Sequence, residues 1–186
     1  MKRLTPIIVL FLLSVSQGSF ASVGGIELPK TQGDLKLHGA GLLRKGLGFM
    51  VYEGALCIES AIHLQDILGP VPKRIDIHYF HTTPKKHMIR VANQSLKRNL
   101  SPRQYNELLP KISKLHEAYL DGKKGSFASL IYRPGEGLTY SFDNETVASI
   151  PCDEFANAYF RVWLGDHPGS RSVKKAMRQD AREPQE

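Results

Sequence analysis

A change of hydrophobic period along the chain constrains its fold most strongly. Apolar and polar residues alternate over residues 34–40 and again over 74–80, which is the pattern of half-buried strands. Between residues 84 and 119 the apolar residues recur at helical spacing instead, and alternation returns after residue 126. Strands and helices that follow one another in runs, rather than in strict alternation, predict an α+β fold.

The strand segments predict a mostly antiparallel sheet with helices packed on one side. Residues 47–59 are nearly continuous in apolar side chains, which is typical of a strand buried on both faces over part of its length. Residues 126–132 and 138–142 flank the turn Pro134-Gly135-Glu136-Gly137 and predict a hairpin. A short further strand is expected at residues 147–150.

Helix boundaries are signalled at two prolines. Ser101 before Pro102, with Gln104 three residues after the serine, predicts an N-cap and a capping box. Pro110 is expected to bend or interrupt this helix. Pro151 is expected to open the last helix.

The N-terminus has the form of a targeting segment. A basic start, an apolar core over residues 4–15 and small residues near Ala21 predict a signal peptide at residues 1–21. The apolar core is too short to span a bilayer comfortably. We therefore expect an exported, periplasmic protein with one domain over residues 22–178 and a charged tail over residues 179–186.

The chain is basic, with a formal net charge of +7. In an exported protein this charge favours peripheral contact with an anionic membrane surface, and nucleic acid is not an expected partner. Much of the excess lies in the stretch from Arg171 to Arg182, which is expected to be a flexible, solvated tail. The sequence leaves the oligomeric state open.

Cofactor and metal motifs are absent from the sequence. It contains no HExxH, no paired CxxC, no GxSxG and no phosphate-binding loop, so neither a metal nor a cofactor is predicted. Cys57 and Cys152 could form one disulfide or remain two separate structural cysteines. A catalytic nucleophile is the less favoured interpretation of either thiol.

Arg44 and Tyr52 are the strongest candidates for a binding site. Arg44 follows a glycine-rich segment expected to be a turn, and Tyr52 should share a strand face with Gly54. A guanidinium and a phenol that converge in an apolar cavity would bind a carboxylate well. The alternative is a solvated loop arginine and a core tyrosine, which the residues alone favour by about two to one.

The order of several segments resembles that of the chalcone isomerase-like family, and of its short bacterial secreted branch in particular. The match extends over roughly residues 35–178 and rests on the segments GAGLLRK, FMVYEGALCIE, LSPRQYNELLP, YRPGEGL and SIPCDEFANAYFRVWLGDHPGS. The resemblance implies an open-faced β-sandwich, in which a large antiparallel sheet and a layer of helices enclose a ligand cleft.

The resemblance also implies roles for individual residues. In the fatty-acid-binding relatives an arginine and a tyrosine hold the carboxylate, and these align with Arg44 and Tyr52. In the cyclising enzymes a threonine stands in place of Tyr52, a tyrosine in place of His87, an asparagine in place of Gln94, and a threonine or serine near Val162. His87 and Gln94 are therefore expected to contact ligand.

These departures favour a binding protein over an enzyme. The expected ligand is a fatty acid or a similar apolar anion, held in a cleft whose apolar lining should include Phe49, Met50, Ile77, Met88 and Val91. The alternatives are an intramolecular lyase of the chalcone–flavanone isomerase type and an envelope scaffold protein.

Overall fold

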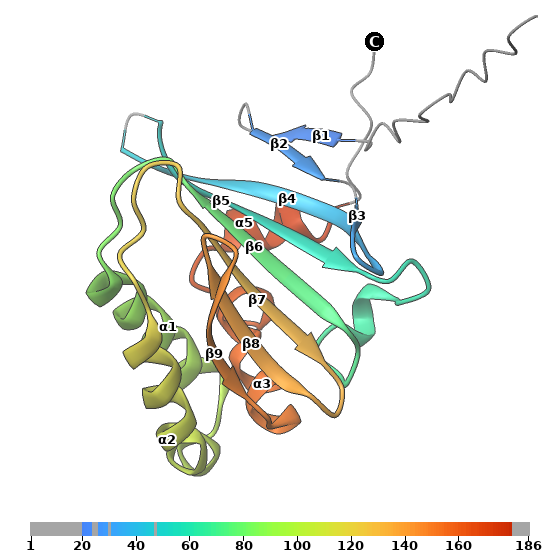
Figure 1. Cartoon of the computed structure of the whole chain (residues 1–186). Coiled ribbons are helices and arrows are strands. Elements are labelled where there is room, and N and C mark those ends of the chain that lie inside the picture. Colours follow the sequence, from blue (N-terminus) through green and yellow to red (C-terminus); the bar gives the residue numbers. More distant parts are fainter. Residues whose placement is uncertain (1–19, 24–25, 30, 47, 180–186) are drawn as a thin grey trace, which may run out of the picture.

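The computed structural model describes residues 20–23, 26–29, 31–46 and 48–179 (Figure 1). Most of the predicted signal peptide, residues 1–19, and residues 180–186 of the predicted charged tail lie outside these ranges. Within them, no helix has the length and apolar character needed to cross a membrane.

One antiparallel sheet dominates the fold, and its seven strands lie side by side in the order of the chain. A short hairpin of β1 and β2 pairs separately from it. The strands are β1 (Phe20–Val23), β2 (Ile26–Pro29), β3 (Thr31–Gln32), β4 (Leu35–Lys45), β5 (Phe49–Ile58), β6 (Lys73–Tyr79), β7 (Phe127–Arg133), β8 (Gly137–Phe142) and β9 (Glu145–Ile150).

The helices form a layer against one face of the large sheet, with α3 and α5 behind it in the view of Figure 1. The α+β, open-faced sandwich predicted from the sequence is thereby confirmed. The helices are α1 (Lys85–Asn99), α2 (Pro102–Ala118), α3 (Asp153–Tyr159), α4 (Arg161–Leu164) and α5 (Arg171–Met177), together with the short 3-10 turn η1 (Leu64–Asp66).

Helix α2 begins as the sequence predicts but does not break where expected. The Gln104 amide donates to Ser101 Oγ at 3.3 Å and the Ser101 amide donates to Gln104 Oε1 at 3.1 Å, which completes the capping box. The helix then continues through Pro110 to Ala118. Pro110 is exposed, so water can bond the carbonyl that the proline leaves without an amide partner.

Contrary to expectation, Gly39 and Gly41 do not form a turn, because β4 continues through both. The chain turns after β4 instead, at Gly46 and Gly48, whose φ angles are 55° and 97°. Their missing side chains make room for α5. A Cβ atom on Gly39 would lie 2.7 Å from the carbonyl oxygens of Ala176 and Met177.

The stretch expected to be a flexible tail therefore begins with an ordered helix. Ser170 caps α5 by accepting a hydrogen bond from the Val173 amide at 3.3 Å. Val173 and Met177 are fully buried, and a Cβ atom on Gly54 of β5 would collide with the end of the Met177 side chain. Two apolar side chains one helical turn apart thus fix α5 to the sheet.

We predict that Gly39→Ala destabilises the protein by about 1–3 kcal/mol, because the new methyl group forces α5 away from β4. Equilibrium urea unfolding measures this difference. The control is Thr146→Ala at an exposed position on β9, which should change the free energy of unfolding by less than about 0.5 kcal/mol. An equal loss of unfolding free energy in both variants would show that the contact of α5 with Gly39 does not determine the stability.

Candidate functional site

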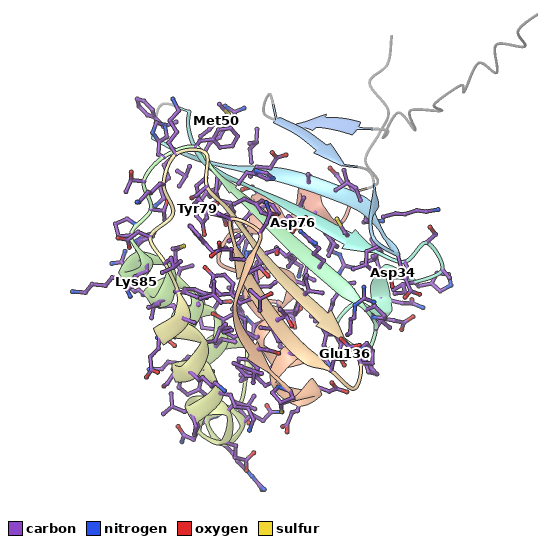
Figure 2. All side chains as sticks on the ribbon, viewed as in Figure 1. Asp34, Met50, Asp76, Tyr79, Lys85 and Glu136 are labelled. Atoms are coloured by element: carbon purple, nitrogen blue, oxygen red, sulfur yellow. The ribbon has the colours of Figure 1, made fainter. Side chains whose placement is uncertain are left out.

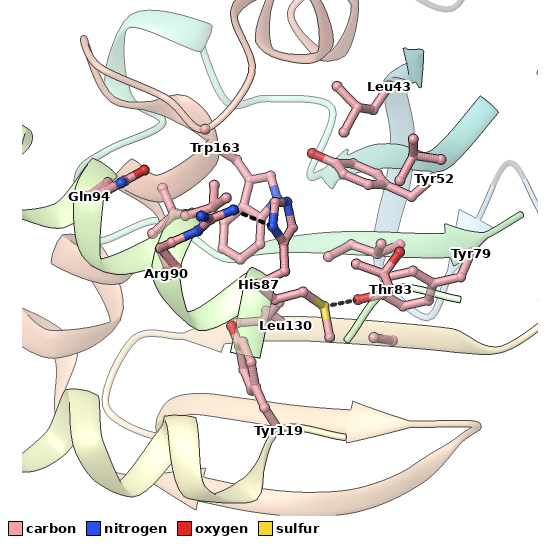
Figure 3. Close-up of a pocket in the computed structure, with 18 of the residues that line it drawn as sticks. Leu43, Tyr52, Tyr79, Thr83, His87, Arg90, Gln94, Tyr119, Leu130 and Trp163 are labelled. Atoms are coloured by element: carbon pink, nitrogen blue, oxygen red, sulfur yellow. Dashed lines mark hydrogen bonds between the residues drawn. The ribbon is translucent and has the colours of Figure 1, made fainter. Parts of the chain in front are cut away.

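A cavity of about 340 Å³ lies between the helix-covered face of the sheet and helices α1 and α4 (Figure 3). Strands β4 to β8 contribute side chains to one wall, and α1 contributes to the other. Apolar side chains make up most of the surface, including Leu43, Val51, Ile77, Met88, Val91 and Leu130. A cavity of this kind is the usual setting for a ligand with a substantial apolar part.

At the floor of the cavity, buried tyrosine hydroxyls form hydrogen bonds with other side chains of the protein. The hydroxyls of Tyr119 and Tyr159 lie 2.6 Å apart, and the Tyr159 hydroxyl is 2.9 Å from His116 Nε2. The Tyr79 hydroxyl donates to the Met88 sulfur at 2.9 Å (Figure 3). Burial lowers the pKa of His116 to about 4, so this network is uncharged at neutral pH. These groups therefore shape the floor and bring no charge to it.

Three basic side chains gather at one side of the cavity. Arg90 Nη2 lies 2.7 Å from His87 Nδ1, and Lys45 Nζ lies 3.4 Å from His87 Nε2. Neither Asp nor Glu is among the residues that line the cavity. Partial burial lowers the pKa of His87, and the charges of Lys45 and Arg90 lower it further. The imidazole is therefore held neutral beside two cations.

A neutral imidazole cannot satisfy both of these neighbours. One ring nitrogen accepts a hydrogen bond, but the other carries the proton, and both Arg90 and Lys45 are donors only. Whichever tautomer forms, one N–H of His87 faces another donor. An anionic oxygen placed between these groups would accept from several of them at once. The cluster thus lacks an acceptor that a bound carboxylate could supply.

Tyr52 brings a further donor to the cavity. It pairs with Leu43 across β4 and β5, and its ring reaches toward the side on which His87 and Trp163 lie (Figure 3). Burial raises the pKa of Tyr52 to about 12, so its hydroxyl is protonated at neutral pH. Among the described residues none hydrogen-bonds this hydroxyl, which leaves it available to a ligand.

The structure brings Tyr52, His87 and Gln94 to the cavity but not Arg44. Arg44 is exposed, and its guanidinium donates to the Gly48 carbonyl at 3.4 Å. The register of β4 against β5 shifts between Leu43 and Arg44, which marks a bulge. Leu43 and Lys45, the two neighbours of Arg44 in the sequence, line the cavity, whereas Arg44 does not. That Arg44 binds ligand stays a prediction, although in this structure its side chain does not line the cavity.

The predicted apolar lining is met in part. Ile77, Met88 and Val91 line the cavity, as does Val162, near which the resemblance implies a serine or threonine in the cyclising enzymes. Met50 is not among the lining residues, and the Phe49 side chain is 65% exposed. Regular alternation would place Met50 on the face of Tyr52, whereas the register of β5 shifts between these two residues.

Sequence reasoning missed Lys45 and Arg90, although a signal for one of them existed. His87 and Arg90 are three residues apart on a predicted helix, which places their side chains on one face. Lys45 stands next to Arg44, and the two side chains point to opposite faces of β4, so only one of them can face the cavity.

A second polar cluster lies on the sheet face opposite the cavity. Glu53 pairs across strands with His78, and Asp76 lies one step further along the same face. Both Glu53 carboxylate oxygens are buried and have no hydrogen-bond partner among the described residues, and burial raises the pKa of this group to about 7. Arg74 Nε donates to Asp76 Oδ1 at 2.6 Å, yet burial still raises the pKa of Asp76 to about 6.

Neither a metal site nor a disulfide is formed by the described residues. No group of three His, Cys, Asp or Glu side chains in this part of the chain could hold a metal ion. Cys57 and Cys152 are both free thiols, so the disulfide that the sequence left open is not present between them. Burial raises the pKa of the Cys57 thiol to about 12, which keeps it unreactive.

The chain matches a family model described as chalcone isomerase-like over residues 21–178. Among solved structures it is similar to the crystal structure of a fatty-acid binding protein of Arabidopsis thaliana, with a TM-score of 0.64 and 15% sequence identity. That alignment covers 84% of this chain and 93% of the plant protein. At this identity the likeness shows a shared fold. A search of curated protein sequences found no match.

We predict that Lys45→Met raises the pKa of His87, because it removes one of the two cations that disfavour the imidazolium. The titration of the imidazole Cε1 resonance by NMR measures this shift. Arg44→Met is the control, since Arg44 lies outside the cavity lining and should leave the titration unchanged. A His87 pKa that stays constant in Lys45→Met would contradict the proximity of the two groups.

We predict that Glu53→Gln stabilises the protein at pH 8, by about 1–2 kcal/mol for a pKa shift of this size. The folded protein holds the Glu53 proton up to a pH of about 7, whereas the ordinary pKa of the group is 4.5. Its contribution to stability is therefore complete below pH 4.5 and is lost as the pH rises through 7. Urea unfolding at pH 5 and pH 8 measures the change, and a variant that gains nothing at pH 8 relative to pH 5 would refute it.

Proposed function

The chain belongs to the chalcone isomerase-like family, and we propose that it is a non-catalytic binder of a fatty acid or a similar apolar anion. The observation that carries this proposal is the cluster of Lys45, His87 and Arg90 on the wall of an apolar cavity without an acidic side chain. In this proposal the ligand carboxylate accepts from these three groups and from the Tyr52 hydroxyl, and its apolar part fills the cavity.

The size of the cavity restricts the ligand. At about 340 Å³ it is near the lower end of the roughly 300–1,000 Å³ range of ligand pockets. This favours a fatty acid of medium chain length or a compact ring system with an acidic group. The burial of the apolar part contributes roughly 25 cal/mol per Å² of surface, and the charge-assisted hydrogen bonds orient the acidic end.

A binding role also agrees with the side chains that the cavity lacks. Its lining contains no carboxylate that could act as a general base, and its floor phenols are occupied by partners within the protein. The resemblance implies that the cyclising enzymes carry other side chains at Tyr52, His87 and Gln94 and a serine or threonine near Val162. These features support binding over cyclisation.

The N-terminal sequence supports export. We include in the proposal that residues 1–21 act as a cleaved signal peptide and that the mature protein works in the periplasm. Amino-terminal sequencing of the protein purified from the cell envelope tests this, and a chain that retains Met1 would refute cleavage.

We predict that the double variant Lys45→Met and Arg90→Met binds laurate about 100-fold more weakly than the wild type, because it removes two charge-assisted donors. Binding of dodecanol, which has the same chain and no charge, should change by less than about threefold. Isothermal titration calorimetry measures both ligands.

The matched control is Arg44→Met, which removes an exposed cation next to Lys45 in the sequence. It should bind laurate as the wild type does. If instead Arg44→Met loses affinity and the double variant does not, the carboxylate is held at Arg44 and the proposed anchor is wrong.

Mass spectrometry of an organic extract of the native protein identifies the natural ligand. A wild-type protein that yields no ligand and also fails to bind laurate would overturn the binding function.

A further inference from the structure

Three segments of the chain meet beside the cavity and form what we call the cavity rim, defined as residues 44–46 and 48–49, residues 80–90 and residues 120–125. Lys45 and Phe49 share a surface depression with residues 81–84 and His87. The Thr83 amide donates to the Gly122 carbonyl at 2.7 Å, and the Gly122 amide donates back at 3.0 Å. In Figure 1 the β4–β5 hairpin and the connections before α1 and after α2 come together at one corner.

Large apolar side chains are exposed on this rim. Phe49 is 65% exposed at the end of the β4–β5 hairpin, and Leu120 is 43% exposed on the loop after α2. Phe49 meets the edge of the His81 ring, with centroids 6.4 Å apart, and is otherwise open to solvent. Two of the four most exposed large apolar side chains among the described residues thus belong to the rim. Exposed apolar side chains that gather on one part of the surface, unlike ones scattered singly, mark an interaction site.

The rim is also strongly basic. Its cations are Arg44, Lys45, Lys85, Lys86, Arg90, Lys123 and Lys124, and its only acidic residue in these segments is Asp121. The Asp121 carboxylate accepts from the Lys85 amide at 2.7 Å, so it caps the start of α1. Figure 2 shows Lys85 and Met50 on one side of the molecule, with Asp34 and Glu136 on the other. The rim therefore combines exposed apolar tips with a surplus of positive charge.

We propose that the cavity rim docks on an anionic lipid bilayer. Phe49 and Leu120 enter the boundary between head groups and acyl chains, and the basic side chains lie against the lipid phosphates. Charge complementarity selects this occupant, since the rim presents seven cations against one acid. Each basic residue near such a surface strengthens binding about fivefold.

The docked orientation gives a reason why the basic cluster of Lys45, His87 and Arg90 and the exposed Phe49 lie at the same end of the molecule. The acidic group of a membrane-dissolved fatty acid lies at head-group depth, which is the depth at which docking would place Lys45 and Arg90. This last step rests on the proposed function, whereas docking itself does not.

Flotation of the mature protein with vesicles tests the docking. We expect the wild type to bind vesicles of phosphatidylcholine and phosphatidylglycerol (3:1) far more strongly than vesicles of phosphatidylcholine alone, and to be released by high salt. Lys85→Glu with Lys86→Glu should weaken binding by about 25-fold or more, and Phe49→Ser should weaken it severalfold.

Matched controls come from α2, away from the rim. Leu109→Ser removes a side chain that is 41% exposed, and Lys111→Glu with Lys114→Glu makes the same change of charge as the rim pair. Both should bind vesicles within about twofold of the wild type. Equal binding to neutral and anionic vesicles, equal loss in rim and control variants, or no vesicle binding at all would overturn the proposal.

Calorimetry with laurate in the absence of vesicles separates this inference from the proposed function. Phe49→Ser and the Lys85, Lys86 double variant keep every residue of the cavity lining and should bind laurate as the wild type does. Laurate binding without vesicle binding would refute docking alone. Vesicle binding by a wild type that does not bind laurate would refute the proposed ligand and leave docking in place.

Discussion

The close approach of α5 to the sheet is the contact on which the arrangement of the helix layer depends. Glycines at three positions of β4 and β5 let α5 lie directly on the strands, with Val173 and Met177 inserted between them. Helix α1, by contrast, stands away from the sheet across larger side chains such as Tyr52, Tyr79 and Met88. A helix layer that is tight at one end and raised at the other leaves an enclosed space in between, and that space is the cavity.

The electrostatics of the cavity follow from the same geometry. The raised α1 presents His87 and Arg90 to the space, and the inward-facing residue at the end of β4 is Lys45. Lys45 and Arg90 are exposed to water, which weakens the repulsion between their charges, and an anion placed between them would be attracted to both. Glu53 lies on the opposite face of the sheet, out of reach of this cluster, and no Asp or Glu among the described residues lines the cavity as a counterion.

Local signals in the sequence were sufficient for the architecture and insufficient for the site. Alternation located the strands, and the capping box at Ser101 was predicted and formed, because both depend on neighbours in the sequence. Helix α5 was missed because its seven residues bury only Val173 and Met177, too few for a recognisable stripe. The glycines of β4 were assigned to a turn because their actual function, contact with a helix about 130 residues later, leaves no local mark.

The position of Arg44 shows the same limit at the level of one residue. An arginine and a lysine are adjacent in the sequence, and alternation along β4 places Lys45 on the face of Leu43, so Lys45 lines the cavity and Arg44 does not. The resemblance selects Arg44, whereas the geometry places its neighbour Lys45 in the lining, so the role of Arg44 stays a prediction. The basic character of the site survives, because either residue could supply a cation.

The packing of α5 has a consequence for the order in which the molecule can be completed. The sheet is a succession of neighbouring strands, so most of it can assemble as the chain emerges, each strand adding to the one before. The groove over Gly39 and Gly54 is different, since α5, the helix that fills it, follows every strand of the sheet in the chain. A nascent chain therefore exposes this groove until residues 171–177 have been made, so the helix layer can close only after the sheet is complete.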